Sequence, residues 1–283
     1  MSSLRAYAEI MRIPNSLMMG LAVIVGMVIT DPKSLIMPGA FTKVILGFLV
    51  GFLLTSSSMV FNDYADREID AINEPSRPIP SGRVAPAVAL FYGFILGFLG
   101  LLLSEMTGSS TLFLAALTFA VALLYNFKLK RYGFLGNLCV AYTVAVPLLY
   151  GSLLSSGMNL KVLLYASMIF LSIVGREITK GISDVEGDSR KGVRTVAVKY
   201  GSRTASLLAF LFFLAAISLS PLPFLLGLTN FPYLILVSIT DAMLFYLSLL
   251  LVKFPDRKTA KMVKNRALIA MAVGLLAFAL GSI

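Results

Sequence analysis

Residues 43–83 read KVILGFLVGFLLTSSSMVFNDYADREIDAINEPSRPIPSGR, and this stretch passes from an apolar run directly into a cluster of acids. Its first part, 43–62, carries a single formal charge, at Lys43. The hydrocarbon core of a bilayer, about 30 Å thick, is crossed by roughly 17–25 mostly apolar helical residues. The stretch therefore predicts a membrane-spanning helix that leads into a polar, functional segment.

Eight further apolar runs extend this pattern over the chain. The hydrophobic share is 58% and the charged share 13%, about half the charge of a soluble protein. We therefore predict an all-α, polytopic membrane protein, a single transmembrane domain over 1–283 with functional segments at 62–83 and 176–203. The expected spans are 14–30, 43–62, 86–104, 111–127, 136–155, 162–176, 204–221, 233–252 and 267–283. Pro221 and Pro223 should stop or kink the seventh span.

Lysine and arginine are distributed unequally between the two sides of these spans. Of the 24 basic residues, 21 belong to the N-terminus and the even-numbered connections, and three to the odd-numbered ones. Such an excess is typical of cytoplasmic loops. It predicts a multi-pass protein of the cell membrane with a cytoplasmic N-terminus and an external C-terminus. The net charge of +10 then needs no nucleic-acid partner.

Two residue types that carry much of enzyme chemistry are scarce. The chain has no histidine, and its only cysteine, Cys139, lies in an apolar run. This excludes a Ser/His/Asp arrangement, haem ligation by histidine and a cysteine-based zinc site.

Nine of the 14 acidic residues fall in two stretches, 63–74 and 177–188. Asn62, Asp66 and Asp70 recur every four residues, which places them on one stripe of a helix, and Asp184 and Asp188 repeat that spacing. Oxygen ligands without cysteine or histidine favour a hard ion such as Mg²⁺. The interleaved basic residues favour a phosphate-bearing substrate. The alternative is that both clusters are solvated loop acids.

The pattern N-D-x-x-D-x-x-x-D from Asn62, the R-P-I-P-S-G-R segment at 77–83 and D-x-E-G-D from Asp184 resemble the UbiA superfamily of intramembrane prenyltransferases. A Y-x-x-x-x-K-R element from Tyr125 adds to the resemblance, which covers essentially the whole chain. Within the superfamily, the chain looks most like the archaeal geranylgeranylglyceryl-phosphate geranylgeranyltransferases. Acceptors of the 4-hydroxybenzoate, homogentisate or chlorophyllide type stay open as alternatives.

The resemblance implies a helical bundle around a central cavity with a cytoplasmic mouth. There Mg²⁺ would bind the diphosphate of a prenyl donor, and a lipid or phosphate-bearing acceptor would receive the prenyl group. The implied metal ligands are Asn62, Asp63, Asp66, Asp70, Asp184 and Asp188. The implied catalytic residues are Asp66, Asp70, Asp184, Asp188 and Tyr125, whose ring could face an allylic cation.

The same resemblance implies a set of substrate-binding residues, namely Arg12, Asn15, Arg77, Lys128, Lys130, Arg131 and Lys180. For several of them a structural role is an equal alternative. Arg12 could extend to the membrane surface, Asn15 could cap the first span, and the lysines could anchor the cytoplasmic side. Asp241 lies inside the eighth span, where we expect it to face the bundle interior.

Two other functional classes share part of this pattern. CDP-alcohol phosphotransferases also combine membrane spans with four-spaced aspartates, but here the acids are divided between two segments separated by four spans. A secondary transporter would be expected to carry acids near the bilayer midplane. Of the acids here only Asp241 is deep, so the sequence favours the enzyme.

Overall fold

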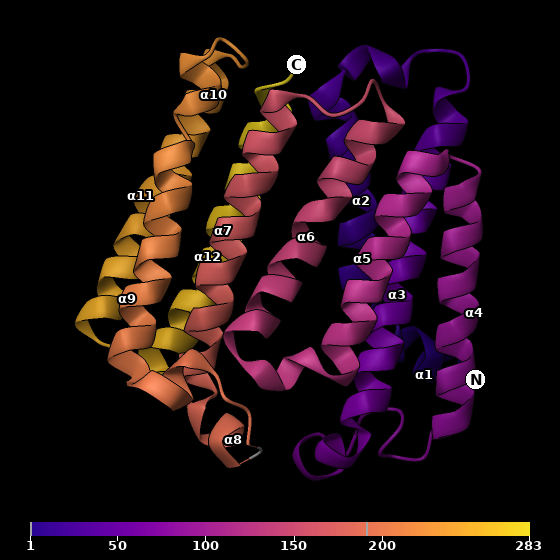
Figure 1. The fold of residues 1–283 in the computed structure, drawn as a ribbon, viewed down its shortest axis with the longest axis vertical. Helices are drawn as coiled ribbons and strands as arrows, with labels where there is room; N and C mark the ends of the chain where they lie inside the picture. Colours follow the sequence, from indigo (N-terminus) through magenta and orange to yellow (C-terminus); the bar gives the residue numbers. More distant parts are fainter. Residues whose placement is uncertain (1, 191) are drawn as a thin grey trace.

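The computed structural model describes residues 2–190 and 192–283, and within these two ranges the chain forms helices and no strand (Figure 1). Nine of the described helices are long and apolar enough to cross a membrane, which confirms the predicted number of spans. They are α2 (Ile13–Thr30), α3 (Ala40–Asn73), α4 (Pro86–Glu105), α5 (Ser109–Phe127), α6 (Phe134–Leu154), α7 (Leu160–Ser183), α9 (Val196–Leu219), α11 (Phe231–Lys253) and α12 (Arg257–Leu280).

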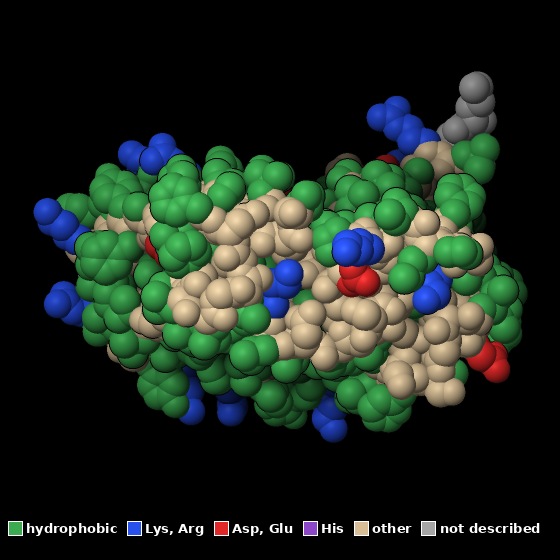
Figure 2. Space-filling model, turned by 90° about the horizontal axis from the view of Figure 1, so that it is seen from above, with side chains coloured by type: hydrophobic (Ala, Val, Ile, Leu, Met, Phe, Trp, Pro, Cys, Tyr) green, Lys and Arg blue, Asp and Glu red, His purple; other side chains and the backbone are tan. Residues whose placement is uncertain are grey.

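Short helices lie at the two ends of this bundle. The end that carries both acidic segments has α1 (Ser2–Ile10), η2 (Leu129–Tyr132) and α8 (Val185–Arg190), and the opposite end has η1 (Pro32–Leu35) and α10 (Leu222–Leu225). Pro221 and Pro223 separate α9 from α11, as predicted, because proline cannot continue the hydrogen-bond ladder of α9. Figure 2 looks onto the α10 end, where most of the visible surface is hydrophobic or uncharged.

The long helices form two groups that share α6 as their link (Figure 1). Helices α2 to α6 pack against one another, α7, α9, α11 and α12 form the second group, and α6 contacts α7. In the second group one apolar cluster joins all four helices, with side chains that include Val174, Phe213, Leu247 and Val263. In a membrane such close packing, rather than the removal of water, holds helices together.

Glycines allow α2 and α6 to touch through their backbones. A Cβ atom added at Gly151 would lie 1.9 Å from the carbonyl oxygen of Val23, and one added at Gly26 would lie 2.2 Å from the carbonyl oxygen of Leu148. Each helix thus contributes a glycine where the other helix presents its main chain. No larger residue fits without separating the helices.

The predicted ends of four spans are wrong. The second and sixth spans are predicted to end at 62 and 176, but α3 continues to Asn73 and α7 to Ser183. The seventh is predicted to begin at 204, whereas α9 begins at Val196 and bends at Gly201, where φ is 85°. The ninth is predicted to begin at 267, whereas α12 begins at Arg257. Hydropathy marks where apolar side chains end, but the helix continues as long as its polar side chains find partners. The functional segments are therefore mainly helical rather than loops.

Asp241 lies on α11 and is half-buried, as expected for an acid that faces the bundle interior. The Ser220 hydroxyl donates a hydrogen bond to its carboxylate. The Tyr233 hydroxyl donates to the Ser220 carbonyl oxygen at 2.6 Å. Asp241 thus joins α11 to the connection that follows α9, far from the acidic segments along the helix.

We predict that Gly151→Ala destabilises the protein by about 1–3 kcal/mol, because the methyl group overpacks the contact between α2 and α6. The measurement is the midpoint of thermal unfolding of the purified protein in detergent. Gly187→Ala is the control, since a Cβ atom there meets no other atom within 4 Å. An unchanged midpoint for Gly151→Ala would contradict the backbone contact.

Candidate functional site

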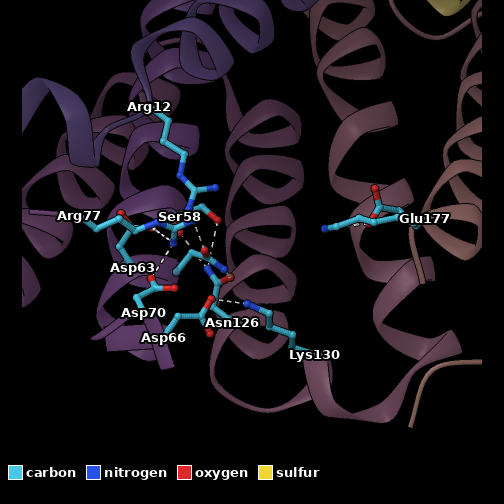
Figure 3. Close-up of polar contacts among 11 residues, drawn as sticks. Arg12, Ser58, Asp63, Asp66, Asp70, Arg77, Asn126, Lys130 and Glu177 are labelled. Atoms are coloured by element: carbon cyan, nitrogen blue, oxygen red, sulfur yellow. Dashed lines mark hydrogen bonds and ion pairs between the residues drawn. The ribbon is translucent and has the colours of Figure 1, made fainter. Parts of the chain in front are cut away.

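The last turns of α3 carry the first motif, which we define as Asn62, Asp63, Asp66 and Asp70 (Figure 3). Because α3 continues unbroken to Asn73, the four-residue spacing does place Asn62, Asp66 and Asp70 on one stripe. Asp63 is 4% exposed and Asp70 is 6% exposed. Buried carboxylates of this kind need a cation or several hydrogen bonds.

Two arginines from outside α3 neutralise the buried pair. Arg12 Nη2 lies 2.6 Å from Asp63 Oδ1 and 3.3 Å from Asn62 Oδ1. Arg77 Nη1 lies 2.6 Å from Asp70 Oδ2 and 3.6 Å from Asp63 Oδ1. Burial alone would lower the pKa of Arg77, but the carboxylates of Asp70 and Asp63 raise it above its ordinary value. Arg12 therefore points toward the motif instead of extending to the membrane surface.

Arg12 reaches the motif from a strained backbone position. Its φ of 48° makes it the only non-glycine residue with a left-handed backbone in the part of the chain that the structure describes. It occupies the position before α2 and makes no capping bond with its side chain. Asn15 neither caps this helix nor joins the first motif, since it lies exposed inside α2.

The third acid of the motif pairs with η2. Lys130 forms an ion pair with Asp66. The Asn62 amide donates to Asn126 Oδ1 at 3.2 Å, and Asn126 Nδ2 donates to the carbonyl oxygen of Ser58 at 2.9 Å. Asn126 is buried and fixes the orientation of the Asn62 amide. This role of Asn126 is not visible in the sequence, because Asn126 belongs to no spaced pattern.

The second segment places a buried acid at the end of α7. Glu177 is 8% exposed and accepts from Arg176 Nη1 at 2.7 Å, and Lys180 Nζ lies 3.7 Å away. Figure 3 shows Glu177 on the opposite side of the view from the first motif. Arg176 Nε is buried and has no hydrogen-bond partner in the described residues. This donor is one that an anion could satisfy.

The second motif, Asp184 and Asp188, lies where α7 passes into α8. Asp184 ends α7, and its carbonyl oxygen accepts from the Asp188 backbone N–H at 2.9 Å. The Ser183 hydroxyl lies 2.7 Å from Asp184 Oδ1. Lys264, from α12, donates to Ser183 Oγ at 3.1 Å and lies 3.7 Å from Asp184 Oδ1. Lys264 is one of several basic residues in its region, so the sequence pattern does not single it out.

The remaining predicted residues lie near the same end of the molecule. The ring of half-buried Tyr125 lies against α6, where a Cβ atom added at Gly136 would be 3.4 Å from it. Lys128 and Arg131 are exposed on either side of Lys130. Lys180 is about half exposed beside Glu177.

The acids of the site are chemically suited to Mg²⁺, although the described residues hold no group of three or more acids close enough to bind a metal ion. The donors are carboxylate and amide oxygens, and Mg²⁺ commonly takes only one or two carboxylates from the protein. In this arrangement lysine and arginine neutralise the carboxylates of Asp63, Asp66, Asp70 and Asp184. Residues that could hold the ion are those of the first and second motifs.

The segment after α3 is fastened to α1. Arg83 Nη1 and Nη2 lie 2.7 and 3.1 Å from the two carboxylate oxygens of Glu9. The hydrogen bond from Arg83 lowers the pKa of Glu9 below its ordinary value. Ala6 and Ile10 of α1 pack with Val60 and Val84 in an apolar cluster. α1 therefore holds the Arg77–Arg83 segment and Arg12 on the same side of α3.

The chain is similar to known proteins over nearly its whole length. A model of the UbiA prenyltransferase family matches residues 19–272. A digeranylgeranylglyceryl phosphate synthase from Archaeoglobus fulgidus is 38% identical over 99% of this chain and 96% of its own length. A solved structure of digeranylgeranylglyceryl phosphate synthase has a TM-score of 0.87 and 35% identity, covering 100% of this chain and 99% of that one.

A more distant solved structure shares the fold alone. It is a UbiA homologue from Archaeoglobus fulgidus bound to geranyl diphosphate (GPP) and Mg²⁺, with a TM-score of 0.70 and 13% identity, and it covers 96% of this chain and 99% of its own.

We predict that Arg77→Met lowers the free energy of unfolding by about 1–2 kcal/mol without added metal, because it leaves Asp70 and Asp63 without their shared cation. Arg77 is 31% exposed, and screening by solvent keeps the loss below that of a fully buried ion pair. Thermal unfolding in detergent with a chelator measures the effect, and added Mg²⁺ should narrow the gap to the wild type. Glu68→Gln, which breaks an exposed pair with Arg67, is the control. A gap that Mg²⁺ leaves untouched would argue against metal binding at these acids.

The ion pair between Glu9 and Arg83 should make the stability of the protein depend on pH. Because the folded state lowers the pKa of Glu9 below its ordinary 4.5, the pair with Arg83 contributes stability above that value and loses it as the pH falls through the folded pKa. Glu9→Gln should therefore be slightly less stable than the wild type at neutral pH, and the difference should vanish in acid. Thermal midpoints over a pH series measure this. The double variant Glu9→Gln/Arg83→Gln should lose no more than Arg83→Gln alone, because Arg83 also donates to Ser81 Oγ and to the Ser76 carbonyl oxygen.

Proposed function

The chain belongs to the UbiA prenyltransferase family, and we propose that it transfers a geranylgeranyl group from geranylgeranyl diphosphate to the hydroxyl of geranylgeranylglyceryl phosphate in membrane ether-lipid synthesis. The observation that most strongly supports this proposal is the full-length similarity to digeranylgeranylglyceryl phosphate synthases. The two aspartate motifs at one end of nine membrane-spanning helices, counted over the described residues, agree with it. We place that end, with the N-terminus, on the cytoplasmic side because the basic residues gather there.

The diphosphate of the donor would bind between the two motifs. We propose that Asn62, Asp66 and Asp70 with Asp184 and Asp188 would hold Mg²⁺. The distant homologue that shares this fold is described as bound to GPP and Mg²⁺. When bound, the ion supplies positive charge that stabilises the departing diphosphate. The basic residues beside the acids would add hydrogen bonds to the phosphoryl oxygens, namely Arg77, Lys130 and Lys180.

Transfer requires the allylic C1–O bond of the donor to break and the acceptor hydroxyl to attack C1. The diphosphate leaves with the bonding electrons, and charge develops on both fragments. The hydroxyl loses its proton as the new C1–O bond forms, and the released diphosphate can take that proton up. Fixed cations near the leaving group stabilise that charge without reorganising during the reaction. The Tyr125 ring, half-buried at the end of α5, would present its aromatic face to the allylic cation. The apolar bundle would keep water from the cation.

A phosphate on the acceptor calls for a second anion site beside the first. Arg176, in the last turns of α7, has a buried Nε without a hydrogen-bond partner in the described chain, and this donor could bind the phosphate of an acceptor. Glu177 accepts from Nη1 of the same guanidinium and holds it in place.

The test offers the purified protein geranylgeranyl diphosphate and Mg²⁺ with one acceptor at a time: geranylgeranylglyceryl phosphate, 4-hydroxybenzoate, homogentisate or a chlorophyllide. Product mass is measured, and we expect product from geranylgeranylglyceryl phosphate. Asp66→Ala and Asp184→Ala should each lower the rate by about 100-fold or more. Glu68→Gln, 84% exposed on α3, should keep the wild-type rate. Product from an aromatic acceptor only would overturn the acceptor but not the family.

A further inference from the structure

The first turns of α12 carry five basic residues, and one of them turns inward. Arg257, Lys258, Lys261 and Arg266 are exposed, whereas the side chain of Lys264 is 19% exposed. The face of α12 that packs on the other helices includes Ala260, Val263 and Ala267, all fully buried. Lys264 borders this face, and its apolar stem can cover the helix contact while its ammonium emerges at the end of α7.

The ammonium of Lys264 meets the second motif. It donates to Ser183 Oγ at 3.1 Å and lies 3.7 Å from Asp184 Oδ1, and the Ser183 hydroxyl itself lies 2.7 Å from that carboxylate oxygen. In the described part of the chain Lys264 forms an ion pair with no other carboxylate. Ser183 is 4% exposed, so the hydroxyl that joins the two charges is fixed by the packing.

The first motif has the same arrangement, with Lys130 paired to Asp66. In both motifs a lysine from a distant segment neutralises an acid that we assign to the metal. Lysine places a single charge on a flexible stem and has three donors, so it can exchange one anionic partner for another. A divalent ion on Asp184 would cancel the charge that holds Lys264 and leave its ammonium beside the diphosphate.

We propose that Lys264 neutralises Asp184 in the absence of metal and donates to a phosphoryl oxygen of the donor diphosphate once a divalent ion binds Asp184. The proposal rests on the proposed function, because it assumes that the second motif receives metal and diphosphate. It makes the last helix, which carries neither motif, part of the donor site. It also requires that Lys264 weaken the binding of the metal ion and strengthen the binding of the diphosphate.

The test measures binding rather than turnover. Mn²⁺, as a paramagnetic substitute for Mg²⁺, is titrated into the full-length protein in detergent and followed by electron paramagnetic resonance. Lys264→Met should bind Mn²⁺ about 3–10-fold more tightly than the wild type, because the competing charge is gone. With Mn²⁺ saturating, isothermal titration should show inorganic diphosphate binding about 10-fold more weakly to this variant. Lys264→Arg, which keeps the charge, should recover most of the diphosphate affinity.

Lys261→Met is the matched control, because Lys261 is exposed one turn earlier on α12 and should leave both affinities at the wild-type value. If Lys264→Met lowers the affinities for Mn²⁺ and for diphosphate equally, the role of Lys264 is merely structural and the proposal is overturned. Unchanged affinities would overturn it as well. A wild-type protein that binds neither Mn²⁺ nor diphosphate would overturn the proposed function as well. If the wild-type protein binds both Mn²⁺ and diphosphate and the Lys264→Met variant binds them with the same affinities, the proposed function stands. Only the role of Lys264 is then refuted.

Discussion

Carboxylates at one end of two membrane helices must be neutralised, and the architecture of this site depends on that constraint. Asp63 and Asp70 are almost fully buried on α3, where an unpaired charge would cost several kcal/mol. Arg12 and Arg77 form ion pairs with them. Since Arg12 joins α1 to α2 and Arg77 follows α3, these two ion pairs fix the N-terminal helix and the segment after α3 against the same end of the bundle.

The same constraint explains why basic side chains gather at the acids. Lysine and arginine are also the side chains that bind phosphoryl oxygens. Under the proposed function, the cations that neutralise the acids would therefore lie close to the donor diphosphate. Asp184 with Lys264 and Asp66 with Lys130 repeat the pairing on different helices. The pairing therefore belongs to the whole acidic end of the bundle rather than to one motif.

Local periodicity correctly predicted which residues share one face of a helix. It did not predict the residues at which the helices begin and end. The stripe of Asn62, Asp66 and Asp70 exists because α3 remains helical through its polar end, although the apolar run stops at 62. Asn15 does not cap the first span, because α2 begins two residues before it, at Ile13, with Arg12 at the preceding position. A cap depends on the backbone angles of one residue, and apolar periodicity does not determine those angles.

The sequence by itself determined the class of fold, the number of spans and the chemistry of the donors, because hydropathy, length and residue type are local properties. It also indicated the family through the two spaced motifs. The tertiary structure decided which cation meets which acid, and where α2 and α6 touch at Gly26 and Gly151. Lys264 and Ser183 are 81 residues apart in the chain. Only the packing of α12 against α7 selects this lysine among the five basic residues of the first turns of α12, since all five carry the same charge.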